Sequence, residues 1–244
     1  MRLHTLIASS AIVMGIASAA SADTVDMQFV ANGRGWRPTV TVNGFSVTNV
    51  FAGERLHLFS NGTGAAAQLD GRTIATFSTD IFQDVARSGA VFDLINAADV
   101  PMAADGASRA AIIENLFRYR ANIDHDAFET ESRARDFAAA FQLAIWEIVY
   151  EPQFSFDNAL GSMSLTSGLM TATRSDGTQL GWWVRKYFDQ IARASSNLHQ
   201  GNGLTIGLTN DYYMNQVATV FIPLPSTAAL GVAGLSIASL RRRR

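Results

Sequence analysis

Residues 130–150 read "TESRARDFAAAFQLAIWEIVY" and carry the strongest helical pattern in the chain. Thr130 can cap the first turn, and Glu131 in that turn interacts favourably with the helix dipole. Apolar side chains recur at the spacing that places them on one face of a helix. They are Phe137, Phe141, Ala144, Ile145 and Ile148. The pattern predicts a long helix with one face against a core.

The segments on either side of this helix predict strands and two more helices. Asn43-Gly44, between two β-branched runs, is typical of a two-residue hairpin. Strands are predicted for residues 39–50, 54–60, 72–79, 204–209 and 215–222, and helices for residues 107–121 and 181–198. The order predicts an α+β domain with an N-terminal β-hairpin and sheet, central helices and C-terminal strands, rather than alternating βαβ units.

The N-terminus is typical of a secretory signal peptide. Arg2 and His4 give a positive start, an apolar run follows, and Ala20-Ser21-Ala22 provides small residues for cleavage. A first core helix or a membrane anchor is the alternative, but the run is short for a membrane span. We therefore expect residues 1–22 to direct export.

The C-terminus has three parts. Pro223, Leu224 and Pro225 precede a Gly/Ala/Leu-rich run, and the chain ends in Arg241, Arg242, Arg243 and Arg244. An ordinary core helix is the alternative, but it does not account for an arginine cluster directly after an uncharged run. The pattern predicts a transmembrane helix whose arginines stay on the cytoplasmic side.

This tail resembles the PEP-CTERM sorting signal of Gram-negative bacteria, with Pro-Leu-Pro in place of Pro-Glu-Pro. The resemblance implies that residues 222–244 hold the chain in the inner membrane until an exosortase, a membrane-embedded processing enzyme, recognises them. It also implies that the protein is then released or attached at the cell surface. Residues 23–221 remain as a single domain.

The composition of residues 23–221 limits the partners of this domain. All 21 acidic residues lie in it. Of the 19 basic residues, Arg2 and the four terminal arginines lie outside it, which leaves 14 and a net charge of −7. An acidic surface argues against nucleic acid as a partner. The chain has no cysteine, so it has neither disulfides nor thiol chemistry.

Two short motifs resemble those of bacterial thioester domains, which occur in surface adhesins and in PEP-CTERM proteins. They are "TFSTDIFQDV" at residues 76–85 and "FQLAIWEIVY" at residues 141–150. In the family, a cysteine and a glutamine condense with loss of ammonia to an internal thioester that captures a nucleophile on a target. Here Ser78 matches the cysteine and Asp80 the nearby acid, while Gln142 and Trp146 match the second motif.

The serine changes the chemistry that the resemblance implies. A cysteine thiol has a pKa of about 8.5 and its thiolate is a good nucleophile, whereas a serine hydroxyl needs an activating base. A thioester cannot form, although an ester between Ser78 and Gln142 is an alternative. Without such a bond, Gln142 is expected to pair with buried backbone groups, Trp146 to lie in the core, and Ser78 to form a turn.

Other candidate sites are weaker. The segment at 122–131 gathers acidic residues around His125 but lacks the glycine and spacing of a calcium loop; its acidic members are Asp124, Asp126, Glu129 and Glu131. His57, His125 and His199 have no ligand-like spacing. No Gly-x-Ser-x-Gly elbow is present in the sequence.

These observations predict an exported, non-enzymatic protein of the cell surface or extracellular matrix, without metal or cofactor. An exopolysaccharide or another surface polymer is the expected partner, as the family resemblance implies. Two alternatives stay open. One is an adhesin with a Ser78–Gln142 ester cross-link, and the other is a secreted enzyme that uses the acidic cluster with His125.

Overall fold

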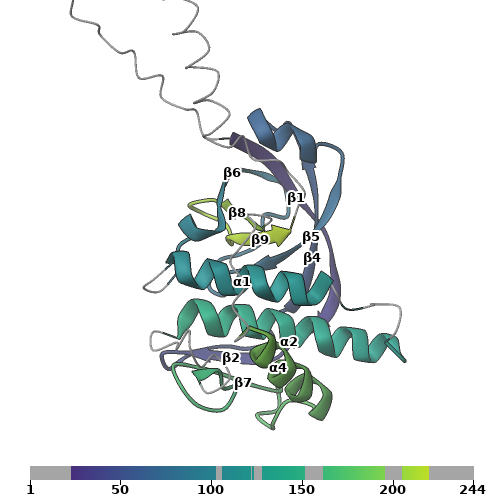
Figure 1. The fold of residues 1–244 in the computed structure, drawn as a ribbon, viewed down its shortest axis with the longest axis vertical. Helices are drawn as coiled ribbons and strands as arrows, with labels where there is room; N and C mark the ends of the chain where they lie inside the picture. Colours follow the sequence, from purple (N-terminus) through teal and green to yellow (C-terminus); the bar gives the residue numbers. More distant parts are fainter. Residues whose placement is uncertain are drawn as a thin grey trace, which may run out of the picture.

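The computed structural model describes residues 23–102, 106–121, 123, 128–151, 162–195 and 205–219. The signal peptide predicted at residues 1–22 and the sorting tail predicted at residues 222–244 lie outside these residues. Figure 1 shows a barrel above two long helices, α1 and α2, with α4 and a small sheet on the opposite side of α2.

Six antiparallel strands close into a barrel in the order β1-β4-β5-β9-β8-β6. Closure comes from β1, which pairs with β6 through residues 23–27 and with β4 through residues 26–36. The strands are β1 (Asp23–Trp36), β4 (Ala52–Ser60), β5 (Thr73–Ser78), β6 (Ala90–Asn96), β8 (Thr205–Thr209) and β9 (Gln216–Thr219). Strands from both ends of the domain therefore share one sheet.

The predicted fold class is wrong in its architecture. We expected an α+β domain with an N-terminal β-hairpin and sheet, central helices and C-terminal strands. Instead the N-terminal and C-terminal strands form one closed barrel, in which β9 pairs with β5 and β8 pairs with β6. The prediction also included a C-terminal transmembrane helix. None of the helices among the described residues is both long and apolar enough to cross a membrane. The predicted helix belongs to residues 222–244, which lie outside these residues.

A second sheet of three strands lies apart from the barrel, in the order β3-β2-β7. Its strands are β2 (Thr39–Val42), β3 (Phe45–Val47) and β7 (Met170–Thr173). Asn43 and Gly44 connect β2 to β3 with φ angles of 50° and 82°, the positive values that a type I′ turn requires. The predicted hairpin is confirmed, although it lies outside the barrel.

The long helix predicted at residues 130–150 is confirmed as α2 (Glu131–Tyr150), with the Thr130 side chain accepting from the Arg133 N–H at its start. Every residue from 137 to 149 is buried, so the helix is enclosed on all sides rather than along one stripe. It packs against barrel strands β1, β4 and β5, and also against α4 and β7. It therefore links the two sheets.

Two further helices complete the layers around α2. They are α1 (Gly106–Ala121) and α4 (Trp182–Ser195), and both were predicted. Short 3-10 helices follow β4 and β6, at η1 (Gly64–Leu69) and η2 (Ala97–Asp99).

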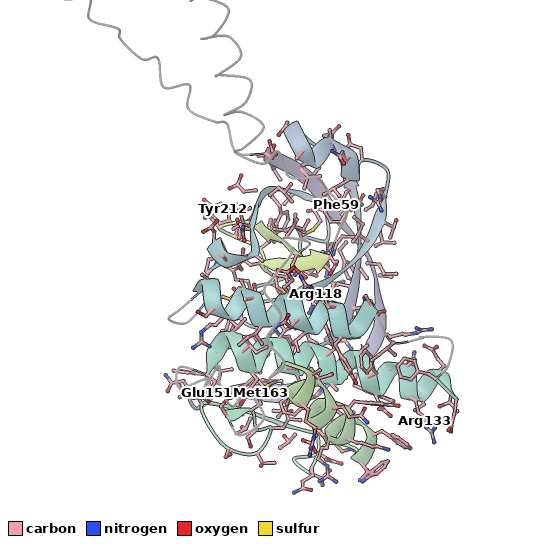
Figure 2. The ribbon with its side chains drawn as sticks, viewed as in Figure 1. Phe59, Arg118, Arg133, Glu151, Met163 and Tyr212 are labelled. Atoms are coloured by element: carbon pink, nitrogen blue, oxygen red, sulfur yellow. The ribbon has the colours of Figure 1, made fainter. Side chains whose placement is uncertain are left out.

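The apolar core has two parts. One fills the barrel and includes Phe59 and Phe92, and Figure 2 shows Phe59 among the barrel strands. The larger part surrounds α2 and includes Phe77, Phe141 and Trp146. Residues 141–146 thus lie where the two sheets meet, and this placement positions the candidate site.

Candidate functional site

The structure brings Ser78 and Gln142 together, although 64 residues separate them. Ser78 ends β5, and Gln142 projects from the middle of α2. The Ser78 N–H donates to Gln142 Oε1 at 3.0 Å, and Gln142 Nε2 donates to the Ser78 carbonyl oxygen at 2.8 Å. Both residues are fully buried. The carboxamide therefore pairs with the end of β5 as another strand's peptide group would.

The Ser78 hydroxyl has different partners. It donates to the Asp80 carbonyl oxygen and accepts from the Asp80 N–H, the second contact being 3.1 Å long. Asp80 Oδ1 in turn accepts from the Phe82 N–H at 2.8 Å, and the Tyr150 hydroxyl accepts from the Ile81 N–H at 3.0 Å. Ser78 and Asp80 thus form a tight turn that the end of α2 holds in place.

These contacts leave no activated nucleophile at the site. Among the described residues, the hydrogen-bond partners of the Ser78 hydroxyl are backbone groups of Asp80, so no side chain is placed to accept its proton. The carboxamide of Gln142 is held by the Ser78 backbone rather than by its hydroxyl. The geometry agrees with the hydrogen-bonding alternative for Gln142 and with the turn-forming alternative for Ser78.

Trp146 lies one turn beyond Gln142 on α2 and is fully buried within the larger core cluster. Its indole Nε1 has no hydrogen-bond partner among the described residues. An enclosed indole cannot serve as a platform for a ligand that arrives from solvent. Its contribution is the burial of a large apolar surface.

Two buried glutamates at the end of α2 were not predicted as site residues. Glu147 Oε1 accepts from the Ser164 N–H at 2.9 Å, and Glu151 Oε2 accepts from the Leu169 N–H at 2.8 Å. The pKa of Glu147 is raised from 4.5 to about 8, chiefly by burial; the hydrogen bond from the Ser164 N–H opposes the shift, and the nearby Glu151 charge adds to it. Both side chains anchor the loop that leads into β7.

The barrel interior holds a polar chain around His57. Its Nδ1 lies 2.9 Å from Thr76 Oγ1, which donates to Gln216 Oε1 at 3.0 Å. Burial lowers the pKa of His57 to about 4, and the nearby Arg55 charge lowers it as well. The ring is neutral at pH 7 and links β4, β5 and β9.

The structure describes only part of the acidic cluster predicted at residues 122–131. Asp124, His125 and Asp126 lie outside the described residues, as does His199. Glu129 pairs with Arg133, and Glu131 lies 3.4 Å from Arg34. In the part of the chain that the structure describes, no three His, Asp or Glu side chains gather in a way that could hold a metal ion.

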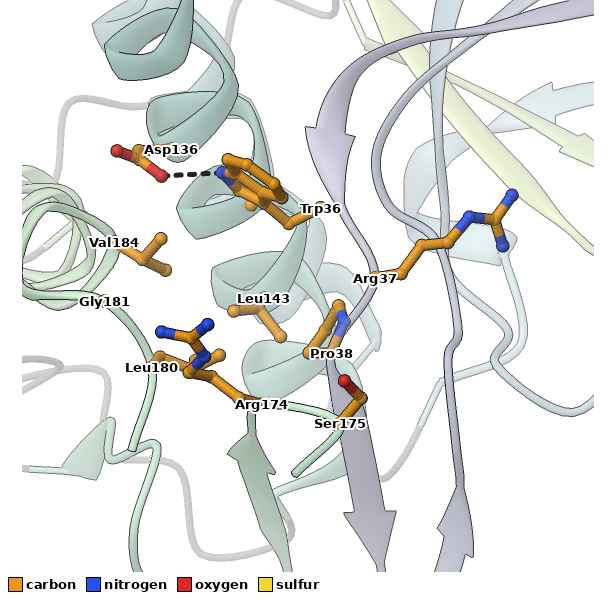
Figure 3. Close-up of a pocket in the computed structure, with 11 residues that line it drawn as sticks. Trp36, Arg37, Pro38, Asp136, Leu143, Arg174, Ser175, Leu180, Gly181 and Val184 are labelled. Carbon is orange, nitrogen blue, oxygen red and sulfur yellow. Dashed lines mark hydrogen bonds between the residues drawn. The ribbon is translucent and has the colours of Figure 1, made fainter. Parts of the chain in front are cut away.

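An open cavity of about 330 Å³ lies beside α2, between the end of β1, the turn after β7 and the start of α4. Figure 3 shows Trp36, Asp136, Leu143 and Arg174 around it. The sequence does not reveal this cavity because its walls come from four separate segments. The exposed Trp182, directly after the cavity residue Gly181, was a local signal that could have indicated it.

No family model, no curated protein and no solved structure matches this chain.

Proposed function

We propose that the chain is an exported, non-enzymatic component of the bacterial cell surface or extracellular matrix. In this proposal, residues 1–22 direct export, and residues 222–244 are a sorting signal for an exosortase-type processing enzyme. The domain between them is similar to a thioester domain. It cannot form a thioester because Ser78 stands where the family has its reactive cysteine. Its role is structural and binding, with a surface polymer as the partner.

The hydrogen bonding of Gln142 is the observation that carries this proposal. Its carboxamide oxygen and nitrogen both pair with the Ser78 backbone. A thioester domain needs the same two positions side by side, but with a thiol that attacks the carboxamide carbon. With serine at position 78, Ser78 and Gln142 connect β5 to α2 through hydrogen bonds. The proximity supports the resemblance, and the hydrogen bonds support the loss of reactivity.

Restoring the thiol with Ser78→Cys tests the proposed relation to thioester domains. The thiolate would attack the Gln142 carboxamide carbon, the C–N bond would break, and ammonia would leave. We expect the peptides that contain residues 78 and 142 to be joined and lighter by one ammonia. Methylamine should then open the bond and remain attached at Gln142. Mass spectrometry of a digest prepared at mildly acidic pH measures each product.

Ser78→Ala is the matched control, since it removes the hydroxyl without supplying a nucleophile. It should show neither the ammonia loss nor the methylamine adduct. If Ser78→Cys folds normally and its thiol stays free, the site lacks the geometry of a thioester domain. The proposed relation would then be wrong.

A further inference from the structure

The cavity beside α2 combines an apolar floor with polar groups at its mouth. Leu143 and Val184 lie along it with Pro38 and Leu180. Its volume of about 330 Å³ lies at the small end of the range for ligand sites. A ring-sized unit with one apolar face and several polar substituents would suit such a cavity.

Trp36 and Asp136 form the best-defined polar contact at this mouth. The Trp36 indole N–H donates to Asp136 Oδ1 at 2.6 Å, and Figure 3 shows this bond beside the cavity. It fixes the indole plane while Trp36 stays 43% exposed. Partial burial raises the pKa of Asp136, and the indole hydrogen bond opposes that shift. The indole offers a stacking face, and Asp136 offers acceptors for hydroxyl groups.

Arg174 supplies a cation on the other side. In Figure 3 its guanidinium points toward the space between Leu143 and Gly181, whereas Arg37 extends away from the cavity. An Asp176 carboxylate oxygen lies 3.9 Å from Arg174 Nε, and both side chains are largely exposed. A guanidinium held this loosely can bind a carboxylate through two parallel hydrogen bonds.

Cations and tryptophans gather around the cavity on this otherwise acidic domain. Arg135 lies over Trp36 at 6.0 Å, Arg133 over Trp183 at 4.1 Å, and Lys186 over Trp182 at 4.8 Å. Trp182 is 57% exposed. Five of the 14 basic residues of the domain belong to this surface, which we call the cationic tryptophan face. They are Arg34, Arg133, Arg135, Arg174 and Lys186. Arg34 and Arg135 lie beside Glu131, Arg133 pairs with Glu129, and Arg174 lies beside Asp176.

We propose that the cationic tryptophan face binds an acidic polysaccharide, with one carboxylate-bearing sugar ring in the cavity. The ring stacks on Trp36, its carboxylate pairs with Arg174, and a hydroxyl donates to Asp136. Neighbouring sugars lie along Trp182 and Trp183. Exposed aromatic faces and cations together suit a polymer with apolar ring faces and regularly spaced negative charge. This inference rests on the proposed matrix-binding function, but it uses a site separate from Ser78 and Gln142.

Binding of oligogalacturonate to the purified protein tests the proposal, with isothermal titration calorimetry as the measurement. We expect saturable binding that weakens with salt. The fully methyl-esterified oligomer has the same rings without the charge, and it should bind about tenfold more weakly or worse. Arg174→Gln and Trp36→Ala should each weaken binding of the acidic oligomer by about tenfold or more.

Two control variants lie on the barrel, away from this face. Tyr212 is 82% exposed, and Figure 2 shows it far from Arg133. Arg87 lies over Phe29. Tyr212→Ala and Arg87→Gln should change binding by less than about twofold. Arg174 lies on an exposed turn, so Arg174→Gln should fold normally. It therefore still tests the proposal if Trp36→Ala does not fold.

Three results would overturn the proposal. The first is that oligogalacturonate does not bind. The second is that the barrel control variants lose as much affinity as Arg174→Gln and Trp36→Ala. The third is that single-stranded DNA of matched charge binds as tightly as oligogalacturonate, which would show a surface that binds any anion. The proposed function fails on different evidence, namely ammonia loss at Ser78 and Gln142 in the unmodified protein. If the protein binds oligogalacturonate and also shows this ammonia loss, the polysaccharide site is supported, but the proposal that the domain is unreactive is wrong.

Discussion

Replacing Gln142 with alanine should destabilise the protein by about 3–5 kcal/mol. The variant would leave the Ser78 N–H and carbonyl oxygen unpaired at a fully buried position. Each unpaired buried group costs about 1–3 kcal/mol, and the cavity left by the missing side chain adds to this. Urea denaturation followed by tryptophan fluorescence measures the change in the free energy of unfolding.

Gln142→Met separates the hydrogen bonds from the packing. Methionine has nearly the same length and fills most of the space, but it can neither accept from the Ser78 N–H as an amide does nor donate to the Ser78 carbonyl oxygen. We expect the free energy of unfolding of this variant to be about 2–4 kcal/mol lower than that of the unmodified protein. Gln28→Ala, at an exposed position of β1, is the control and should stay within about 0.5 kcal/mol of the unmodified protein. A Gln142→Met protein as stable as the control would show that the contact with Ser78 contributes little.

The buried carboxyl of Glu147 should make the protein less stable as the pH rises from about 5 to about 8. The unfolded chain releases this proton near pH 4.5, whereas the folded protein holds it until about pH 8. Between these values the native state binds one more proton, so the free energy of unfolding falls with pH. The slope is about 1.4 kcal/mol per pH unit, and the total is on the order of 4 kcal/mol.

Glu147→Gln should remove this slope, because the amide keeps the shape of the neutral acid and its oxygen can still accept from the Ser164 N–H. Urea denaturation at pH 5, 7 and 9 gives the comparison. Glu131→Gln, at the exposed start of α2, should keep the pH profile of the unmodified protein. If Glu147→Gln loses stability with rising pH as steeply as the unmodified protein, the ionisation of Glu147 does not cause the pH dependence.

The elements that the sequence predicted well are those with strong local signals. The Asn43-Gly44 turn, the capped start of α2 at Thr130 and the spacing within α4 each depend on neighbouring residues alone. Hairpin turns and helix caps are determined by short-range geometry. For this reason these elements could be predicted although the architecture could not.

The barrel was missed because β1 does not read as a strand. Its second half contains Asn-Gly-Arg-Gly at 32–35, which resembles a turn, and its pairing with β4 shifts register between Asn32 and Gly35. Gly35 faces Gly53, and a Cβ on Gly35 would lie 2.3 Å from the Ala52 carbonyl oxygen. Here the glycines permit close approach of two strands, whereas in the sequence they indicate a break.

The Ser78 and Gln142 positions could be paired only through the resemblance of their motifs. The sequence does not show which atoms meet, because this depends on how the end of β5 faces α2. Glu147 and the cavity around Trp36 depend on packing between distant segments. Trp36 ends β1, whereas Arg174 and Trp182 come more than a hundred residues later.

The central claim is that the Ser78–Gln142 pair fastens the domain without a covalent bond. Mass spectrometry of a digest of the unmodified protein tests it most directly. We expect the peptides containing Ser78 and Gln142 to appear separately, each at its full mass. A joined peptide lighter by one ammonia would show an ester between the two side chains, and it would contradict the assignment of an unreactive site.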